Sequence, residues 1–230
     1  GSGSGGSGED DGSGGFEGVD KPYQSGDGEV TITGYAFPRS AVSILVDGSG
    51  ADTVTADGNG RFSVTLEEIA RGVYTFGVYA VDRQGVKSST FSTTFLVTGG
   101  RGSTLSNVNV MPSIKVTPNP VTPGQSLTVN GYALPNAVVT IENQRDKSAA
   151  GLKTLTANSD SAGAWTIAVD TTGFQNGTYK VRAKAEQASE GIKTSFSGYT
   201  FYGVGEAAQA PRSSDLNRDG KVNLIDFSIL

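Results

Sequence analysis

The chain has 230 residues, of which 18 are Lys or Arg and 23 are Asp or Glu, giving a net charge of -5. Phosphate-binding surfaces need a basic patch, so this balance and the lack of a Lys/Arg cluster argue against a nucleic-acid partner. Cys and His are both absent, which excludes thiol chemistry, Ser–His–Asp or Cys–His catalysis and zinc sites built on those ligands. No stretch approaches the roughly 20 apolar residues that span a bilayer.

Residues 1–15 (GSGSGGSGEDDGSGG) are predicted to form a flexible linker, because glycine and serine bury little surface and leave the backbone unrestricted. The segment is either a remnant of cloning or a native spacer, and its acidic Glu-Asp-Asp insert favours the spacer. The sequence starts with neither Met nor a signal peptide, as expected of a mature secreted form or an excised fragment.

An internal repeat follows, and it defines the organisation of the chain. The stretch VTITGYAFPRSAVSI at 30–44 matches LTVNGYALPNAVVTI at 127–141, and two shorter segments after each stretch also recur in order. The two copies are predicted to occupy 16–98 and 113–204. Each is close to the ~100 residues of an immunoglobulin-type sandwich.

Both copies are predicted to consist of strands. Apolar and polar residues alternate along short runs, which are separated by turns rich in Gly, Pro, Asn and Asp, so each strand has one buried face. This pattern predicts two stacked antiparallel sheets in each copy. Tyr74 and Tyr179 are expected to be tyrosine-corner residues, and Phe62 and Trp165 to be core residues rather than sugar platforms. The inward-facing residues predicted for the two copies are Val30, Ile32, Val42, Ile44, Val46, Phe62, Val64, Leu66, Tyr74, Phe76, Val78, Ala80, Phe91, Thr93, Phe95, Val97, Leu127, Val129, Val139, Ile141, Trp165, Ile167, Val169, Tyr179, Val181, Ala183, Tyr199 and Phe201.

The first strands of the two copies differ. Residues 113–125 of copy two make a good first edge strand, whereas the equivalent segment 16–28 of copy one is weaker. Copy one therefore has either a short first strand or an exposed edge that accepts a strand from a neighbouring chain. Residues 99–112 are predicted to be the interdomain linker, although their second half has strand character and could pack on either domain. Residues 205–214 are predicted to be a second linker.

The segment DLNRDGKVNLID at 215–226 has the spacing of a calcium loop. Ca²⁺ takes six to eight oxygen ligands, and here acidic and amide side chains stand at the positions that supply them. Gly220 occupies the position where the backbone turns sharply, and Val222 would plug the loop into a small core. The alternative is a solvated turn that is rich in Asp and Asn. The predicted Ca²⁺ ligands are Asp215, Asn217, Asp219, Asn223 and Asp226 through their side chains and Lys221 through its backbone carbonyl.

Other acidic residues are weaker metal candidates. Asp57, Asn59 and Asp160 lie in segments that are typical of hairpin turns. A turn is therefore the first interpretation of these residues, and a metal site is the second. Asp82 is expected either to cap a loop or to bridge to the neighbouring module through calcium.

Two family resemblances follow from these motifs. The repeat, with its shared Gly-Tyr-Ala-[Phe/Leu]-Pro segment, resembles the bacterial Ig-like modules of secreted and cell-surface proteins. Residues 215–230 resemble the first half of a dockerin, a calcium loop that leads directly into a helix. Dockerins often present hydroxyl residues at loop positions ten and eleven for cohesin recognition, where this chain has Leu224 and Ile225.

The sequence therefore predicts an all-β fold, with two tandem immunoglobulin-like β-sandwiches and a short C-terminal calcium-loop and helix stub. The resemblances imply a non-enzymatic protein of the bacterial cell surface, in which stalk or adhesion modules carry a calcium-binding docking element. Its partner would be another protein, a second copy of itself or a glycan. The alternatives are a protomer of a surface filament or layer assembled by strand addition, and a carbohydrate-binding accessory region of a larger secreted enzyme.

Overall fold

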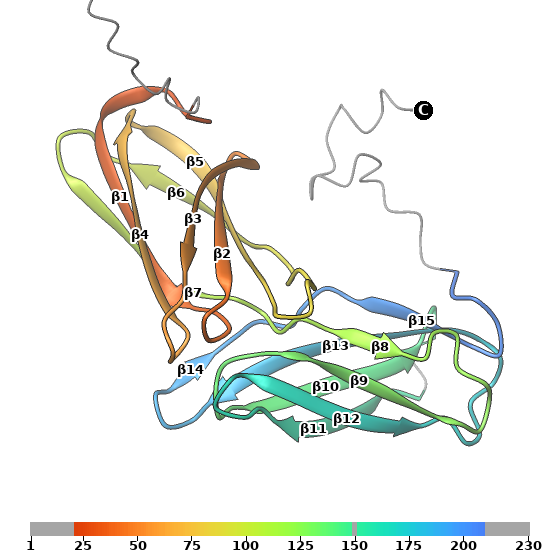
Figure 1. The fold of residues 1–230 in the computed structure, drawn as a ribbon. Helices are drawn as coiled ribbons and strands as arrows, with labels where there is room; N and C mark the ends of the chain where they lie inside the picture. Colours follow the sequence, from red (N-terminus) through yellow and green to blue (C-terminus); the bar gives the residue numbers. More distant parts are fainter. Residues whose placement is uncertain (1–20, 149–150, 210–230) are drawn as a thin grey trace, which may run out of the picture.

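The computed structural model describes residues 21–148 and 151–209, which form two β-sandwiches one after the other (Figure 1). No helix occurs in this part of the chain, so the predicted all-β class is confirmed there. The predicted calcium loop and helix stub lie outside the described residues. The strands of the first sandwich are β1 (Ser25–Tyr35), β2 (Ala41–Val46), β3 (Ser49–Thr55), β4 (Arg61–Ile69), β5 (Gly72–Val81), β6 (Phe91–Val97) and β7 (Gly102–Asn109). Those of the second are β8 (Lys115–Thr117), β9 (Ser126–Tyr132), β10 (Val138–Arg145), β11 (Lys153–Asn158), β12 (Ala164–Asp170), β13 (Gly177–Gln187), β14 (Ile192–Lys193) and β15 (Thr200–Val204).

Each sandwich has the strand order of an immunoglobulin-like Greek key. In the second, one sheet has the order β12-β9-β8, and the other the order β11-β10-β13 with β14 and β15 both paired to β13. In the first, the sheets are β4-β1-β7 and β3-β2-β5-β6. The inner faces of the two sheets of each sandwich form a separate apolar core, as the period-2 alternation predicts.

The two sandwiches differ at one sheet edge. In the second, β8 precedes β9 in the chain and pairs antiparallel with it. In the first, the equivalent edge of β1 is covered by β7, which follows the sandwich in the chain and runs parallel to β1. The segment 99–112, predicted to be a linker whose second half has strand character, supplies the strand at this edge of β1.

β7 belongs to the core of the first sandwich. Val108 and Val110 are fully buried there, and Leu105 packs against the same cluster. The backbone N–H of Val110 also donates to the carbonyl oxygen of Tyr35 at 2.8 Å. Because β7 occupies the edge of β1, this edge is not open to a strand from a neighbouring chain in the structure. The strand addition suggested for it from the sequence is thus corrected.

The prediction of which face of the last strand, β15, points into the core is also wrong. The alternation places Tyr199 and Phe201 inside, but Tyr202 is the fully buried residue and Tyr199 is exposed. The register explains this, since Tyr202 lies opposite Tyr179 of β13 and directly opposed residues share a face of the sheet. The rings of these two tyrosines stack at 5.7 Å. Burial raises the pKa of Tyr202, whose hydroxyl donates to Oδ1 of Asn143 at 2.8 Å.

The tyrosine-corner prediction is confirmed in both copies. The hydroxyl of Tyr74 donates to the carbonyl oxygen of Ala70 at 3.0 Å, and that of Tyr179 to the carbonyl oxygen of Gln175 at 3.1 Å. Each bond reaches four residues back along the chain and fixes the entry into β5 or β13.

Candidate functional site

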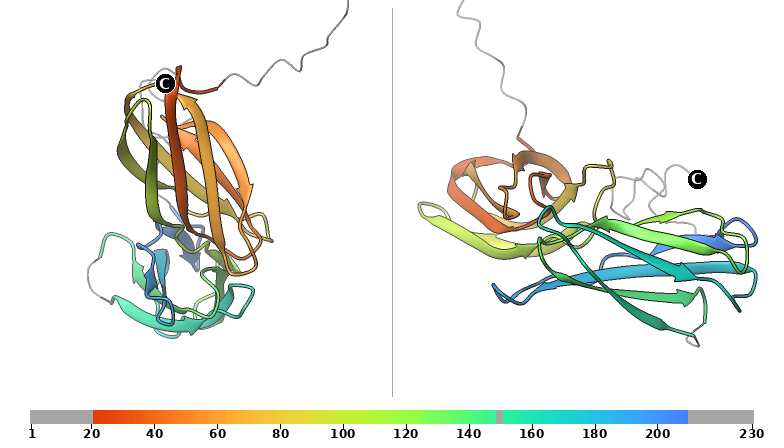
Figure 2. Two further views of the ribbon diagram at one scale, coloured as in Figure 1. Left: turned by 90° about the vertical axis from the view of Figure 1, so that its left-hand side faces the viewer. Right: turned by 60° about the horizontal axis from the view of Figure 1, so that its bottom comes forward.

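The two sandwiches meet end to end at a strong angle, so the described part of the chain is L-shaped (Figures 1 and 2). The corner is formed by equivalent turns of the two repeats. A Cβ added to Gly163 would lie 2.9 Å from Cδ of Pro38, and one added to Gly60 would lie 3.6 Å from Cδ of Pro135. The proline turn of each repeat thus faces the glycine turn of the other repeat. The junction therefore has approximate twofold symmetry, like the isologous interface of a dimer.

The tyrosine of the repeated Gly-Tyr-Ala motif packs across this junction, against the core of the opposite sandwich. Tyr35 of the first sandwich packs against the core of the second, and Tyr132 of the second packs against the core of the first. The ring of Tyr132 lies 6.5 Å from that of Phe37. Each aromatic side chain thus buries part of its surface in the opposite module, which couples the position of one sandwich to that of the other.

The connection between the sandwiches is short and buried. All five residues of the connector 110–114 are buried, and both of its ends are held by the motif tyrosines. The N–H of Val110 donates to the carbonyl oxygen of Tyr35, and the N–H of Ser113 donates to the carbonyl oxygen of Tyr132 at 3.0 Å. A connector bonded in this way leaves little freedom for a hinge.

Asp82 caps a loop, as one of its two predicted roles requires, and it also contacts the connector through a direct hydrogen bond. The calcium bridge stays a prediction. Oδ1 of Asp82 accepts from the backbone N–H groups of Gln84 and Val86 at 2.8 and 2.9 Å, which caps the loop after β5. Its Oδ2 accepts from the hydroxyl of Ser113 at 2.6 Å, so the same carboxylate reaches the connector. The Ser113 oxygen in turn accepts from the N–H of Tyr132 at 2.9 Å.

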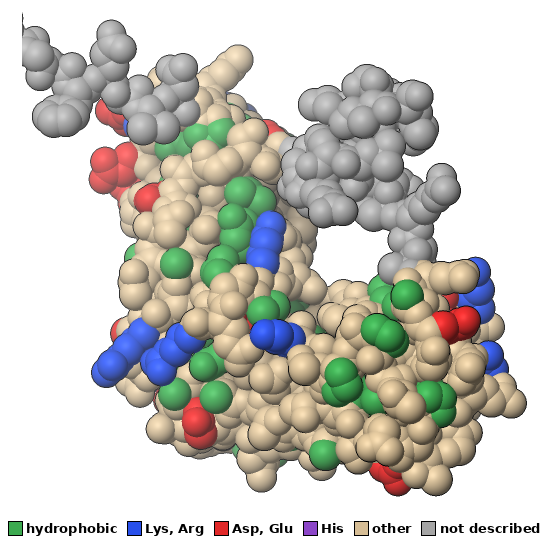
Figure 3. All heavy atoms as spheres, turned by 45° about the vertical axis from the view of Figure 1, so that its right-hand side comes forward, with side chains coloured by type: hydrophobic (Ala, Val, Ile, Leu, Met, Phe, Trp, Pro, Cys, Tyr) green, Lys and Arg blue, Asp and Glu red, His purple; other side chains and the backbone are tan. Residues whose placement is uncertain are grey.

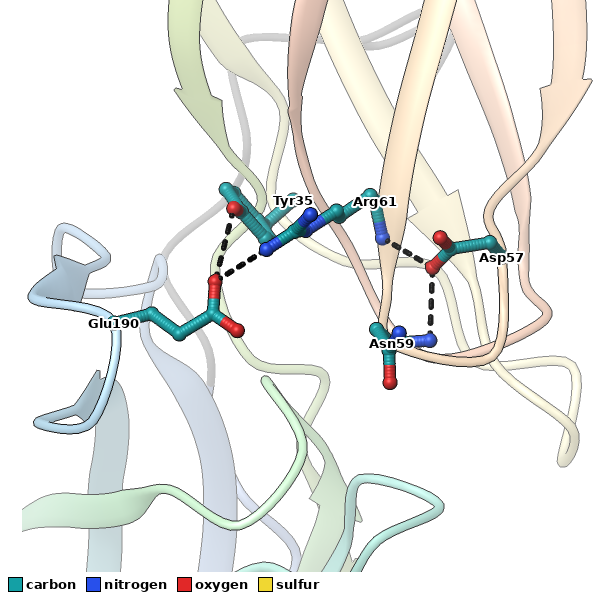
Figure 4. A network of polar contacts seen from close by, with 5 residues as sticks. All are labelled: Tyr35, Asp57, Asn59, Arg61 and Glu190. Carbon is teal, nitrogen blue, oxygen red and sulfur yellow. Dashed lines mark hydrogen bonds and ion pairs between the residues drawn. The ribbon is translucent and has the colours of Figure 1, made fainter.

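One side of the junction is closed by an ion pair (Figure 4). Nη2 of Arg61 lies 2.7 Å from Oε2 of Glu190, and the hydroxyl of Tyr35 donates to the same oxygen at 3.3 Å. This hydrogen bond with Glu190 raises the pKa of Arg61. Figure 4 also shows that Oδ1 of Asp57 accepts from the backbone N–H groups of Asn59 and Arg61.

The acidic segments form turns, as predicted, but these turns are not hairpins. They join β3 to β4 and β11 to β12, and the two strands of each pair belong to different sheets. Asp160 repeats the arrangement of Asp57, with Oδ1 accepting from the N–H groups of Ala162 and Ala164 at 2.8 and 2.9 Å. Among the described residues, no three His, Cys, Asp or Glu side chains gather closely enough to hold a metal ion. The predicted calcium ligands Asp215, Asn217, Asp219, Lys221, Asn223 and Asp226 lie outside the described residues and stay a prediction.

Two hollows stand out on the described surface. The first, of about 420 Å³, lies at the junction and is lined by Pro38, Arg39, Gly58, Arg83, Ser161 and Ala162. The second, of about 390 Å³, lies at the far end of the second sandwich and includes Arg145, Lys153, Phe174 and Tyr179. In the second hollow the faces of Phe174 are occupied, because Tyr179 stacks on the ring at 4.9 Å and Nζ of Lys153 lies 4.6 Å from its centroid.

Sequence reasoning missed the junction as a site, although one signal for it was present. The repeat keeps a tyrosine, at Tyr35 and Tyr132, in a position beside the strand end where an isolated sandwich has no need of a large aromatic. The core interpretation of Phe62 and Trp165 is confirmed, since both are at most 5% exposed and neither offers a face to a sugar. No helix in the described part of the chain is long and apolar enough to span a membrane.

No protein-family model matches the sequence, and no curated protein matches it. Among solved structures, the chain is similar to the chicken interferon gamma receptor alpha chain, with 16% identity, TM-score 0.34 and coverage of 74% of this chain and 86% of that one. It is similar to a tetra-tandem repeat from the extending region of a large adhesion protein, with 17% identity, TM-score 0.30 and coverage of 76% and 49%. It is also similar to the fibronectin(III)-like modules of Clostridium thermocellum CbhA, with 14% identity, TM-score 0.25 and coverage of 84% and 95%.

TM-scores below 0.5 do not establish a shared fold, so the class of the protein rests on the strand pairing itself. By its sheet order and its two tyrosine corners, the chain is a tandem pair of immunoglobulin-like β-sandwiches.

Proposed function

We propose that this chain is a non-enzymatic structural module that holds its two far ends at a fixed angle, as part of a stalk or adhesion protein of the bacterial cell surface. The observation that carries the proposal is the reciprocal junction, in which each motif tyrosine packs on the opposite core. A flexible spacer needs no such contacts, because interdomain motion is the default unless the interface is extensive and apolar.

The buried connector supports the same function. A chain that transmits position or force between modules must resist bending at their boundary, and here residues 110–114 are buried and bonded to both sandwiches. Asp82 adds a bond from the first sandwich to this connector. Together these contacts favour a fixed angle between the two sandwiches over two domains joined by a flexible linker. We call this fixed junction the elbow.

Distances between two spin labels test the elbow directly. The chain has no Cys, so Arg71→Cys in the first sandwich and Thr154→Cys in the second, both exposed, supply the only two labelling sites. We expect double electron–electron resonance to give a single narrow distance distribution. A broad distribution, spanning bent and extended arrangements, would refute the fixed elbow.

We further propose that residues 215–226 form a Ca²⁺-binding element that docks the module to a protein partner or to a second copy of the chain outside the cell. The support is the spacing of the oxygen-bearing residues and the resemblance to the first half of a dockerin. The alternative function is a carbohydrate-binding accessory region of a larger secreted enzyme, and its partner would be a glycan.

Calorimetry tests the calcium element. Titration of Ca²⁺ into the full chain should give binding heat that disappears in an Asp219→Ala variant, because the loop loses a carboxylate ligand. The control is Asp52→Ala, an exposed carboxylate of β3 that lies outside the loop and should leave the heat unchanged. Identical heats from the wild-type chain and the Asp219→Ala variant would show that the loop is only a solvated turn.

A further inference from the structure

The two quasi-equivalent sides of the junction carry different charges. On one side, the loop after β13 provides Glu190, which pairs with Arg61 at the start of β4. On the other side, the equivalent loop after β5 provides Arg83 in place of an acid, and it faces the turn at Ser161 and Ala162, just before β12. The first side is therefore closed by an ion pair, whereas the second has a cation with no acidic counterpart.

A hollow of about 420 Å³ lies at this second side, which is in the size range of ligand pockets. Arg39 and Arg83 both line it, and both are exposed. Neither guanidinium group makes a hydrogen bond or an ion pair with any residue in 21–148 or 151–209. Figure 3 shows Lys and Arg side chains gathered where the two sandwiches meet.

The backbone at both arginines is held in place. Arg39 has a φ of 60° in the turn after Pro38, and its N–H donates to the carbonyl oxygen of Asp57 at 3.0 Å. Arg83 follows Asp82, whose two carboxylate oxygens bind the loop and Ser113. Both side chains thus line the hollow from backbone positions that are held in place, which lowers the entropy lost on binding a ligand.

The acidic groups of the adjoining loops do not pair with these two arginines. Asp82, which precedes Arg83, uses its carboxylate oxygens to accept from backbone N–H groups of its own loop and from Ser113. Asp57 and Asp160 are the carboxylates of the adjoining turns, and each uses Oδ1 to accept two backbone N–H bonds of its own turn. Neither is within ion-pair distance of Arg39 or Arg83. An incoming carboxylate would consequently meet unpaired guanidinium groups, which bind carboxylates in a bidentate, fork-like geometry.

We propose that this hollow is a binding site for an acidic peptide segment, with a Glu or Asp carboxylate held between Arg39 and Arg83. The ligand carboxylate takes the place that Glu190 occupies on the opposite side of the junction. A peptide fits better than an acidic sugar, because the six lining residues include no aromatic ring on which a sugar could stack.

Fluorescence anisotropy with the full chain tests the site. The probe is a fluorescein-labelled peptide, Gly-Ser-Glu-Glu-Gly-Ser with its C-terminus amidated, and the matched neutral probe has Gln in place of Glu. We expect the acidic probe to bind and the neutral probe to bind at least ~10-fold more weakly, since two charge-assisted contacts are lost. The affinity should fall as salt rises, because the contact is between partly exposed charges.

The variant Arg39→Gln/Arg83→Gln should weaken binding of the acidic probe at least ~10-fold while leaving the unfolding midpoint unchanged, since both side chains are exposed. Arg101→Gln is the matched control, because Arg101 is an exposed arginine in the turn before β7, at the end of this strand that lies away from the junction. It should bind like the wild-type chain. No binding at millimolar protein, equal binding by the double variant, or binding of glucuronate without binding of the peptide would each overturn the proposal.

Discussion

A chain carrying both Tyr35→Ser and Tyr132→Ser should keep two folded sandwiches and lose the fixed angle between them. Each tyrosine packs against the core of the opposite module, so each truncation removes apolar contact that only the docked arrangement provides. Partly buried aromatic side chains of this kind contribute about 1–3 kcal/mol each to such an interface. With both removed, the remaining ion pair of Arg61 and Glu190 is exposed and contributes little to docking.

The readout is the same label pair, at Arg71→Cys and Thr154→Cys. We expect the narrow distance distribution of the parent chain to become broad in the double tyrosine variant, and the thermal unfolding transition to separate into two. Tyr79→Ser is the matched control, because Tyr79 lies on the outer face of β5 with Lys87 over its ring and takes no part in the junction. A distribution that stays narrow in the double variant would mean that the buried connector alone sets the angle.

Much of the fold follows from local pattern, and the part that does not has a physical reason. Alternation identified the inward faces because a half-buried strand repeats every two residues. β7 breaks this rule, since Leu105 and Val108 both face the core although they are three residues apart. Asn107, between them, has a φ of 61°, and the register with β1 shifts at this point. A bulge of this kind adds one residue to the strand, so the side chains after it point to the opposite face from the one that alternation predicts. The apolar residues of β7 therefore do not show the period of two that identifies a strand in the sequence.

The junction could not be derived from sequence for a different reason. Arg61 and Glu190 are separated by more than a hundred positions, and no local pattern relates them. Their pairing depends on the angle between two sandwiches, which is set by the reciprocal packing of Tyr35 and Tyr132. The last strand shows the same dependence on a smaller scale, because the burial of Tyr202 follows from its register with β13 and not from alternation along β15.

The largest single effect should come from Gly34→Ala. Gly34 precedes Tyr35 in the repeated motif, and a Cβ at this position would overlap the carbonyl oxygen of Val108 and lie 2.9 Å from its backbone nitrogen. These are backbone atoms of β7, so no side-chain rotation relieves the overlap and the strand must move away from β1. We expect the first sandwich to lose about 3 kcal/mol or more of stability, which lowers its unfolding midpoint by roughly 10 °C or more.

Two glycine variants and one local measurement separate this effect from a general sensitivity to substitution. Gly131→Ala is the counterpart in the second sandwich, where the Cβ would overlap the carbonyl oxygen of Ser113, and it should destabilise that module instead. Gly58→Ala should have little effect, because a Cβ there meets no atom within 4 Å. Hydrogen exchange of 102–109 should accelerate in Gly34→Ala and in neither control. Unchanged exchange in this segment would contradict the claim that β7 can pair with β1 only because residue 34 has no Cβ.

The fate of the edge of β1 gives the Gly34→Ala variant a second consequence. When β7 leaves, Val30 and Ile32 are still part of a sheet, but the backbone groups of β1 that paired with β7 become free. An unpaired edge of this length accepts a strand from another molecule, so the variant should form dimers or larger species at concentrations where the parent chain is monomeric. Sedimentation at several concentrations distinguishes the outcomes. Self-association of Gly34→Ala alone would show that β7 completes the first sandwich and at the same time blocks strand addition between copies.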